Sequence, residues 1–277
     1  METKLAQLKS LLNDLGSVLV AYSGGVDSTL LASLSHEILG KRSLAVTARS
    51  PIFSPVEISQ AQSLAQRLGL RHVIIDTNQL EDASFVANDL QRCYYCKQAL
   101  CQRLKNIANE KGLAFVLDGT NYDDQDDFRP GGKAAVELGV RSPLLEVGLT
   151  KEEIRALSRN MGLPNWEKQS SPCLATRLPH GTQITLDLLA LIDKAEQSLA
   201  KLGLTQFRVR HHGPIARIEA SPNDMVLFAN EKTRLRAIAE LHDLGYTFVT
   251  LDLAGYIPGG RNSLHLDSAS MPLQNIR

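Results

Sequence analysis

The chain has 277 residues, 43% of them hydrophobic, which is enough to bury a sizeable core in one large domain or two. Its 30 basic and 30 acidic side chains leave no overall positive field, so a nucleic-acid partner is not expected. The sequence has no apolar run of membrane-spanning length, and residues 1–16 are amphipathic rather than signal-like. These features favour a cytoplasmic enzyme without a membrane partner.

The first predicted elements are a strand, a glycine turn and a helix. SVLVAY (17–22) is short, apolar and β-branched, whereas leucines recur at helical spacing over 28–39. Between them lies SGGVDS (23–28), which places two glycines at the start of the helix. The first N–H groups of a helix lack intrahelical partners and carry partial positive charge, so this turn predicts a phosphate site.

Asp27 indicates that a cation binds together with the phosphate. A carboxylate beside a phosphate repels it unless a cation lies between them, so Asp27 predicts Mg²⁺ bound to a polyphosphate. The turn lacks the lysine of the G-x-x-x-x-G-K-[ST] pattern, which disfavours an ordinary P-loop kinase or GTPase. For this stretch alone, a plain glycine turn with a capping aspartate remains the alternative.

Strand and helix patterns then alternate through the first half of the chain. Further strands are predicted at 43–48, 71–76 and 113–119, and further helices at 55–69 and 97–110. This alternation predicts an α/β fold, in which a parallel sheet is flanked by helices and ligands bind beyond the carboxyl ends of the strands.

The pattern changes near residue 150. TKEEIRALSRNMG (150–162) predicts a helix that opens with a capping box of Thr150 and Glu153. After a turn-rich segment we predict a smaller α+β domain, with helices at 186–202 and 222–243 and strands at 205–210, 214–219 and 246–252. The domains are placed at 1–175 and 176–257, and residues 258–277 are expected to be a flexible tail.

Three of the four cysteines are candidates for metal, cluster or redox chemistry. Cys93 and Cys96 form a C-x-x-C pair that suits a metal, a cluster or a redox disulfide, with buried structural thiols as the alternative. Cys101 fits a helical apolar pattern, whereas Cys173 lies in a polar, proline-flanked loop. If Cys93, Cys96 and Cys173 meet at the edge of the sheet, they suit zinc with water or a [4Fe-4S] cluster with one open iron. An open iron can hold a hydrosulfide, which would place a sulfur donor beside the predicted phosphate site.

The motifs resemble known families at two levels. SGGVDS is similar to the PP-loop of the ATP pyrophosphatases, which split ATP into AMP and pyrophosphate; this implies an adenine nucleotide alpha hydrolase-like fold. The blocks at 118–166, 173–185 and 208–219 resemble the LarE family of sulfur transferases in nickel-pincer nucleotide biosynthesis, and the likeness covers nearly the whole chain. The resemblance implies that ATP and Mg²⁺ adenylate the carboxylates of pyridinium biscarboxylic acid mononucleotide, that sulfur replaces AMP, and that the protein is a homo-oligomer, with hexamers known.

The resemblance also implies roles for individual residues. In one LarE subgroup a single cysteine at the position of Cys173 gives up its own sulfur, and in the other three cysteines hold a cluster whose extra sulfide is donated. The presence of Cys93 and Cys96 favours the cluster form with a [4Fe-4S] cofactor, whose source of sulfide the sequence does not identify. The residues expected to bind ATP and Mg²⁺ are Ser23, Gly24, Gly25, Asp27, Ser28, Gly119, Thr120 and Asn121.

Three arginines are expected to bind the phosphate and carboxylates of the substrate, because a guanidinium group pairs with both in a bidentate manner: Arg177, Arg208 and Arg210. Asp124 and Asp127 either help to hold the metal or are simply solvated. The alternatives to this function are a tRNA thiolation enzyme with an iron–sulfur cluster, an amide-forming ligase, and a non-catalytic nucleotide-binding or zinc-stabilised module. A neutral chain without an appended basic domain argues against the tRNA enzyme.

Overall fold

The computed structural model describes residues 1–125 and 130–257, so the expectations for Asp127 and for the tail 258–277 lie outside the described residues. The chain forms two compact units, which divide between Ala190 and Leu191. The boundary expected from the sequence, after residue 175, precedes this division. The functional assignment of the two domains stays a prediction.

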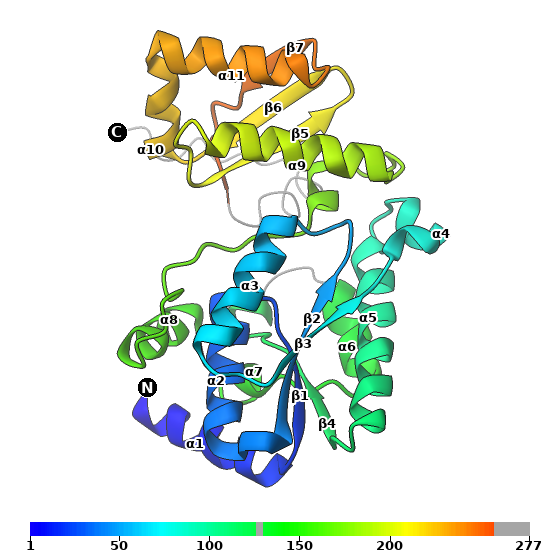
Figure 1. Cartoon of the computed structure of the whole chain (residues 1–277), viewed down its shortest axis with the longest axis vertical. Helices are drawn as coiled ribbons and strands as arrows, with labels where there is room; N and C mark the ends of the chain where they lie inside the picture. The colour runs from blue at the N-terminus through cyan, green and yellow to red at the C-terminus, as the bar shows by residue number, and fades with distance from the viewer. Residues whose placement is uncertain (126–129, 258–277) are drawn as a thin grey trace. The chain divides into compact units, whose positions relative to one another are not determined.

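The first unit is built on a four-stranded parallel sheet. Its strands lie in the order β3-β2-β1-β4, and every neighbouring pair is parallel (Figure 1). This confirms the predicted α/β class. The strands are β1 (Val18–Ala21), β2 (Ser43–Arg49), β3 (His72–Asp76) and β4 (Phe115–Leu117).

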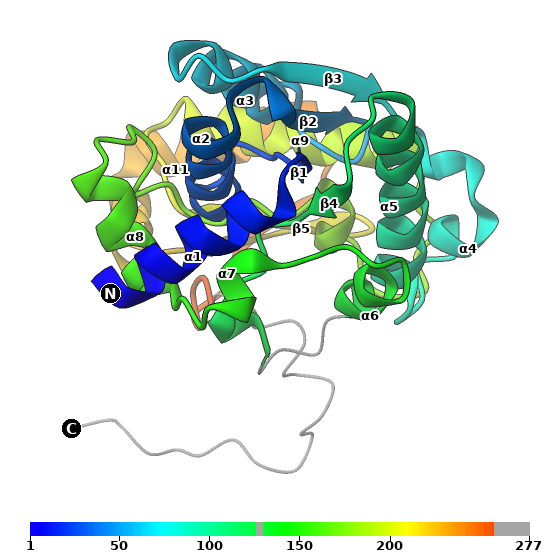
Figure 2. The ribbon, with the colours of Figure 1, turned by 90° about the horizontal axis from the view of Figure 1, so that it is seen from below.

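Helices cover both faces of this sheet, because alternate residues of each strand point to opposite faces. Val18 and Val20 pack into one apolar cluster with helices α1, α2 and α8, whereas Leu19 packs into a second cluster with α5 and α6. Figure 2 shows α1 and α2 on one side of the strands and α5 and α6 on the other. The helices of the first unit are α1 (Glu2–Leu15), α2 (Val26–Leu39), α3 (Pro55–Arg67), α4 (Ala83–Val86), α5 (Arg92–Glu110), α6 (Pro130–Glu137), α7 (Pro143–Glu146) and α8 (Lys151–Asn160).

Short 3-10 turns connect several of these elements, and one follows Cys173. The turns are η1 (Gly40–Arg42), η2 (Gln79–Glu81), η3 (Tyr122–Gln125) and η4 (Leu174–Arg177). The predicted capping box is confirmed, since Thr150 Oγ1 accepts from the Glu153 N–H while the Glu153 carboxylate accepts from the Thr150 N–H.

The second unit contains a three-stranded sheet in the order β5-β6-β7, with β5 and β6 antiparallel and β6 and β7 parallel. Its strands are β5 (Phe207–His212), β6 (Ile215–Ala220) and β7 (Phe248–Leu251). Helix α9 (Leu186–Ala200) contains the division between the two units. The single helix predicted at 222–243 is wrong. It is divided into α10 (Pro222–Met225), η5 (Val226–Ala229) and α11 (Glu231–Asp243), because Asn230 is extended and its side chain caps the start of α11.

Among residues 1–125 and 130–257, no helix is both long and apolar enough to cross a membrane.

Candidate active site

The SGGVDS loop (residues 23–28) connects the end of β1 to the start of α2 and contains a position that only glycine can occupy. Gly24 has φ +70°, which side chains rarely adopt, and a Cβ there would lie 2.8 Å from the Ala61 backbone on α3. The loop therefore passes directly against α3.

Two serine hydroxyls close this loop on itself. Ser23 Oγ and Ser28 Oγ lie 3.1 Å apart, Ser28 Oγ accepts from the Ser23 N–H at 3.2 Å, and Ser23 Oγ accepts from the Gly25 N–H at 3.3 Å. Gly25 is the N-cap of helix α2, and no side chain caps the start of this helix. Its first turn therefore has the free N–H groups and the partial positive charge that suit a phosphate.

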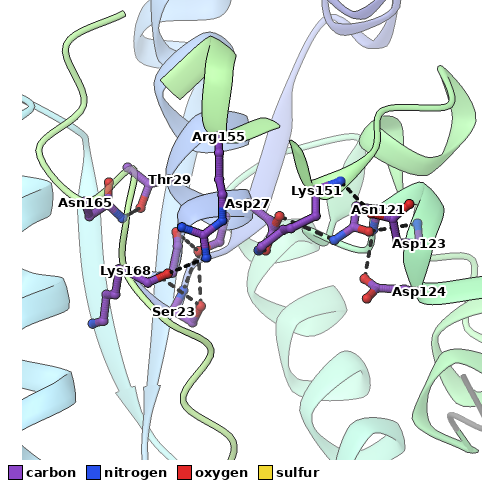
Figure 3. Close-up of polar contacts among 12 residues, drawn as sticks. Ser23, Asp27, Thr29, Asn121, Asp123, Asp124, Lys151, Arg155, Asn165 and Lys168 are labelled. Atoms are coloured by element: carbon purple, nitrogen blue, oxygen red, sulfur yellow. Dashed lines mark hydrogen bonds and ion pairs between the residues drawn. The ribbon is translucent and has the colours of Figure 1, made fainter. Parts of the chain in front are cut away.

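Asp27 forms an ion pair with Lys151 at the start of α8 (Figure 3). The Asn121 amide donates to the other Asp27 carboxylate oxygen at 3.4 Å. Sequence reasoning missed Lys151, although its position directly after the Thr150 cap placed it at a helix N-terminus. Asp27 thus already contacts a cation supplied by the chain, and the predicted Mg²⁺ remains a prediction.

The loop after β4 touches the SGGVDS loop. A Cβ on Gly119 would lie 3.0 Å from Ser28 N, so this glycine permits a close approach to the first turn of α2. Asn121 donates its N–H to Asp124 Oδ2 at 3.0 Å, and Asn121 Oδ1 accepts from the Asp123 N–H. The Asp124 carboxylate therefore stabilises the loop that carries Asn121, and its expected part in metal binding stays a prediction.

Asp118, at the base of this loop, contacts the cysteine-bearing helix. Its buried carboxylate pairs with Lys97 Nζ at 2.8 Å and accepts from Ser142 Oγ at 2.8 Å and from the Thr120 N–H at 3.2 Å. Burial alone would raise the pKa of Asp118, but Lys97 and these hydrogen bonds hold that pKa below its usual range. Since Lys97 directly follows Cys96, this pair joins α5 to the nucleotide loop.

Cys93, Cys96 and Cys173 lie in the same part of the first unit, and their role as a site stays a prediction. Cys93 and Cys96 lie in the first two turns of α5, and Cys173 precedes η4. Burial, followed by the Cys173 and Cys93 thiols, raises the pKa of Cys96 to about 12. Burial and Cys93 likewise raise the pKa of Cys173. The three thiols therefore lie close enough for one to affect the pKa of another, although they form no group that could hold a metal ion among the described residues. The raised pKa values keep Cys96 and Cys173 in their neutral forms at neutral pH.

Arg92 is a second residue that sequence reasoning missed. Its buried guanidinium donates from Nη1 to Asn88 Oδ1 at 2.6 Å and to the Ala175 carbonyl at 3.0 Å, and Nη2 approaches Cys93 Sγ at 3.7 Å. Arg92 thereby ties the start of α5 to the turn that carries Cys173. Its place immediately before the C-x-x-C pair was the one available signal.

The three arginines predicted to bind substrate lie in different settings. Arg177 is 2% exposed and donates to the carbonyls of Pro172 at 2.7 Å and Cys173 at 3.1 Å, so it holds the Cys173 loop. In the second unit, Arg210 is buried and paired with Glu219, and Arg208 stacks over the Tyr256 ring at 4.9 Å. A substrate role for these arginines stays a prediction.

The loop geometry and the parallel sheet define a nucleotide-using α/β domain of the PP-loop type. Residues 3–123 match the NAD synthase family. The chain is also 26% identical to a glutamine-hydrolyzing GMP synthase from Aeropyrum pernix over 209 residues, which are 68% of this chain and 40% of that protein.

More extensive similarity identifies the family. The chain is 40% identical to the pyridinium-3,5-bisthiocarboxylic acid mononucleotide synthase of Lactiplantibacillus plantarum over 266 residues. This alignment covers 95% of each protein. It is 41% identical over 262 residues to an uncharacterized protein of Synechocystis sp., covering 95% of this chain and 98% of that one. The chain belongs to the LarE family of ATP-dependent sulfur transferases.

Proposed function

We propose that this enzyme adenylates the carboxylates of pyridinium-3,5-biscarboxylic acid mononucleotide and replaces AMP with sulfur, giving thiocarboxylates. The name of the Lactiplantibacillus relative supports the choice of substrate. The main structural support is a series of contacts that connects the SGGVDS loop to the cysteine-bearing helix α5. Gly119 touches the SGGVDS loop, and Asp118, the residue before it, pairs with Lys97 of the cysteine-bearing helix.

The SGGVDS loop serves the adenylation step. The free N–H groups of α2 and the two serine hydroxyls bind the β- and γ-phosphates of ATP, while Asp27 and Asn121 offer oxygen ligands of the kind that Mg²⁺ prefers. The substrate carboxylate attacks the α-phosphorus and the bond to the bridging oxygen breaks. Pyrophosphate leaves with the electron pair, and an acyl adenylate remains.

Cysteine sulfur serves the second step. The Cys173 thiolate attacks the acyl carbon, the carbonyl reforms and AMP leaves with its electron pair, which gives a thioester to Cys173. A base then removes the Cα proton of Cys173 and the Cβ–Sγ bond breaks. The thiocarboxylate leaves with the electron pair of that bond, and dehydroalanine remains at position 173. Arg92 and Arg177 fix the backbone around Cys173, so they set where the attacking sulfur lies. Because burial raises the pKa of Cys173, a proton must leave this thiol before it attacks.

The cysteines are also the predicted ligands of a [4Fe-4S] cluster, which would supply a sulfide that can be replaced between turnovers. Thiolates are the ligands that such a cluster takes. The arrangement of Cys93, Cys96 and Cys173 does not suit it, because the described residues contain no group of three or more metal-ligating side chains placed to hold an ion. We therefore derive no step through a cluster.

One experiment tests both the reaction and the source of sulfur. The chain is purified without oxygen, analysed for iron and sulfide, and incubated with ATP, Mg²⁺ and the pyridinium nucleotide; pyrophosphate, thiocarboxylate and the mass of the chain are then measured. The proposal requires pyrophosphate and thiocarboxylate in equal amounts.

The mass of the chain then separates the two sulfur sources. Loss of the mass of hydrogen sulfide from Cys173 indicates a sacrificial cysteine, whereas an unchanged mass with bound iron supports the cluster. Cys93→Ala is the matched variant, since a sacrificial Cys173 tolerates it and a cluster does not. ATP turnover without thiocarboxylate would overturn the proposed function.

A further inference from the structure

Residues 165–168 lie across the SGGVDS loop and have no role in the proposed chemistry. They follow α8 and are fixed at both ends. Arg155 of α8 donates to the carbonyls of Trp166 at 3.0 Å and Lys168 at 3.2 Å, while Lys168 Nζ pairs with Glu57 of α3 at 2.7 Å. Figure 3 shows Arg155, Asn165 and Lys168 gathered beside Ser23 and Asp27. The segment therefore connects α8 to α3 beside the nucleotide loop.

Asn165 is the residue of this segment that contacts the loop. Its Nδ2 donates to the Gly24 carbonyl at 3.0 Å and to Thr29 Oγ1 at 3.0 Å. The carbonyl of Gly24 can only accept, so the amide nitrogen must face it and the orientation of the amide is determined. Asn165 Oδ1 is buried without a hydrogen-bond partner among the described residues. The amide thus contacts the loop at Gly24 and helix α2 at Thr29, and it leaves one acceptor unsatisfied, which costs stability.

These contacts fix the direction of one peptide group. The C=O and N–H of a trans peptide point in opposite directions, so holding the Gly24 oxygen toward Asn165 turns the Gly25 N–H the other way. That N–H points to Ser23 Oγ, in the hydroxyl pair of the loop. With Ala61 packed against Gly24 on the α3 side, the loop is held from two directions.

We propose that Asn165 is a positioning residue for the nucleotide reaction, whose amide holds the Gly24–Gly25 peptide in the orientation that receives the β,γ-diphosphate of ATP. The inference rests on the proposed function only in taking ATP as the nucleotide. A peptide that is free to turn must be ordered when the diphosphate binds, and this ordering weakens binding. AMP lacks the diphosphate, so its binding is independent of Asn165.

The test is calorimetric titration of the full chain with ATP and, separately, with AMP in the presence of Mg²⁺. Asn165→Ala is expected to weaken ATP binding about tenfold and to change AMP binding by less than about twofold. Asn165→Asp is expected to weaken ATP binding further, since it places a carboxylate against the Gly24 oxygen and near an anionic ligand. The matched control is Asn106→Asp on the exposed surface of α5, which leaves both affinities unchanged.

Equal weakening of ATP and AMP by Asn165→Ala would overturn the inference, because it indicates a general structural role, and so would unchanged ATP binding. If Asn165→Ala does not fold, Lys168→Met releases the segment from Glu57 and Gln60 and leaves Asn165 in place. It is then expected to weaken ATP binding alone, by about threefold. These titrations contain no acceptor substrate, so they measure nucleotide binding alone. A failure of sulfur transfer in the earlier experiment would therefore not affect their result. A wild-type chain that does not bind ATP overturns both proposals.

Discussion

The SGGVDS loop and the cysteine trio (Cys93, Cys96 and Cys173) are built in contrasting ways. The loop consists of six consecutive residues, and its shape follows from two glycines, two hydroxyls and the N-terminus of helix α2. The trio joins a helix to a loop distant in sequence, and it depends on the bridging contacts of Arg92. A site made from contiguous residues is ready for its ligand once its helix forms, whereas a composite site also requires correct packing of the segments that support it.

The largest effect is expected when the loop is altered at Gly24. Gly24→Ala forces a side chain into a left-handed conformation and against the Ala61 backbone, so pyrophosphate release is expected to fall more than about 100-fold. Gly16→Ala is the matched control, because Gly16 has φ +72° with open space around it. It is expected to cost about 1–2 kcal/mol of stability and leave turnover intact. Equal activity of the two variants would contradict a preshaped loop.

The contact between the two regions is tested at Lys97. Lys97→Met leaves the Asp118 carboxylate buried without a counter-charge, which is expected to cost about 3–5 kcal/mol of unfolding free energy at neutral pH. Because Lys97 lowers the folded-state pKa of Asp118, the pair stabilises the protein above the unfolded pKa of aspartate, about 3.9. The stabilisation disappears as the pH falls through the lower, folded-state pKa.

Urea unfolding of wild type and Lys97→Met at several pH values measures this difference. Lys9→Met is the control, since it breaks an exposed pair with Glu37 and is expected to change stability by less than about 1 kcal/mol. A difference between wild type and Lys97→Met that stays constant down to low pH would show that the pair is not its source.

A smaller and more selective effect is expected at Arg92. Arg92→Gln removes the charge and weakens the link between α5 and the Ala175 carbonyl, so sulfur transfer is expected to slow about tenfold. Pyrophosphate release is expected to change little, because the hydrogen bonds of the Arg92 guanidinium go to Asn88, Ala175 and Cys93 rather than to the SGGVDS loop. Quenched-flow measurement of both products separates the two steps. Equal slowing of both would remove the distinction between the two regions.

The last prediction concerns the pH dependence of thiol alkylation at Cys96 rather than turnover or stability. Because the pKa of Cys96 is raised to about 12, only a small fraction is thiolate at neutral pH. Its reaction with iodoacetamide in the folded chain is expected to rise about tenfold per pH unit well beyond pH 8.5, where an unfolded cysteine levels off. Peptide mapping by mass spectrometry follows the site. A plateau near pH 8.5 in the folded chain would contradict burial of this thiol.

The sequence was sufficient for the sheet and for much of the helix pattern, because hydrophobic periodicity and capping are local. The capping box at Thr150 and the four strands of the first sheet follow from such signals. The break at Asn230 was missed because a capping asparagine inside an otherwise helical pattern is a weak signal until the chain direction is known.

The supporting residues of the site could not be predicted in the same way. Lys151, Arg92 and Asn165 contact partners that are far away in sequence, so their roles depend on packing. Nothing in the residue types alone distinguishes Asn165 from an ordinary loop asparagine. The structure also showed that Arg177 and Arg210 already have partners, which no motif indicates.

Cys101 offers a practical use that follows from its position. It is 1% exposed and lies on the same helix as Cys93 and Cys96, packed with Leu104 in the apolar layer beneath the sheet. A reagent reaches this sulfur only when α5 separates from the strands, so its labelling rate reports how often that layer opens. Cys101 is therefore a built-in probe of local unfolding of α5, the helix that carries Cys93 and Cys96.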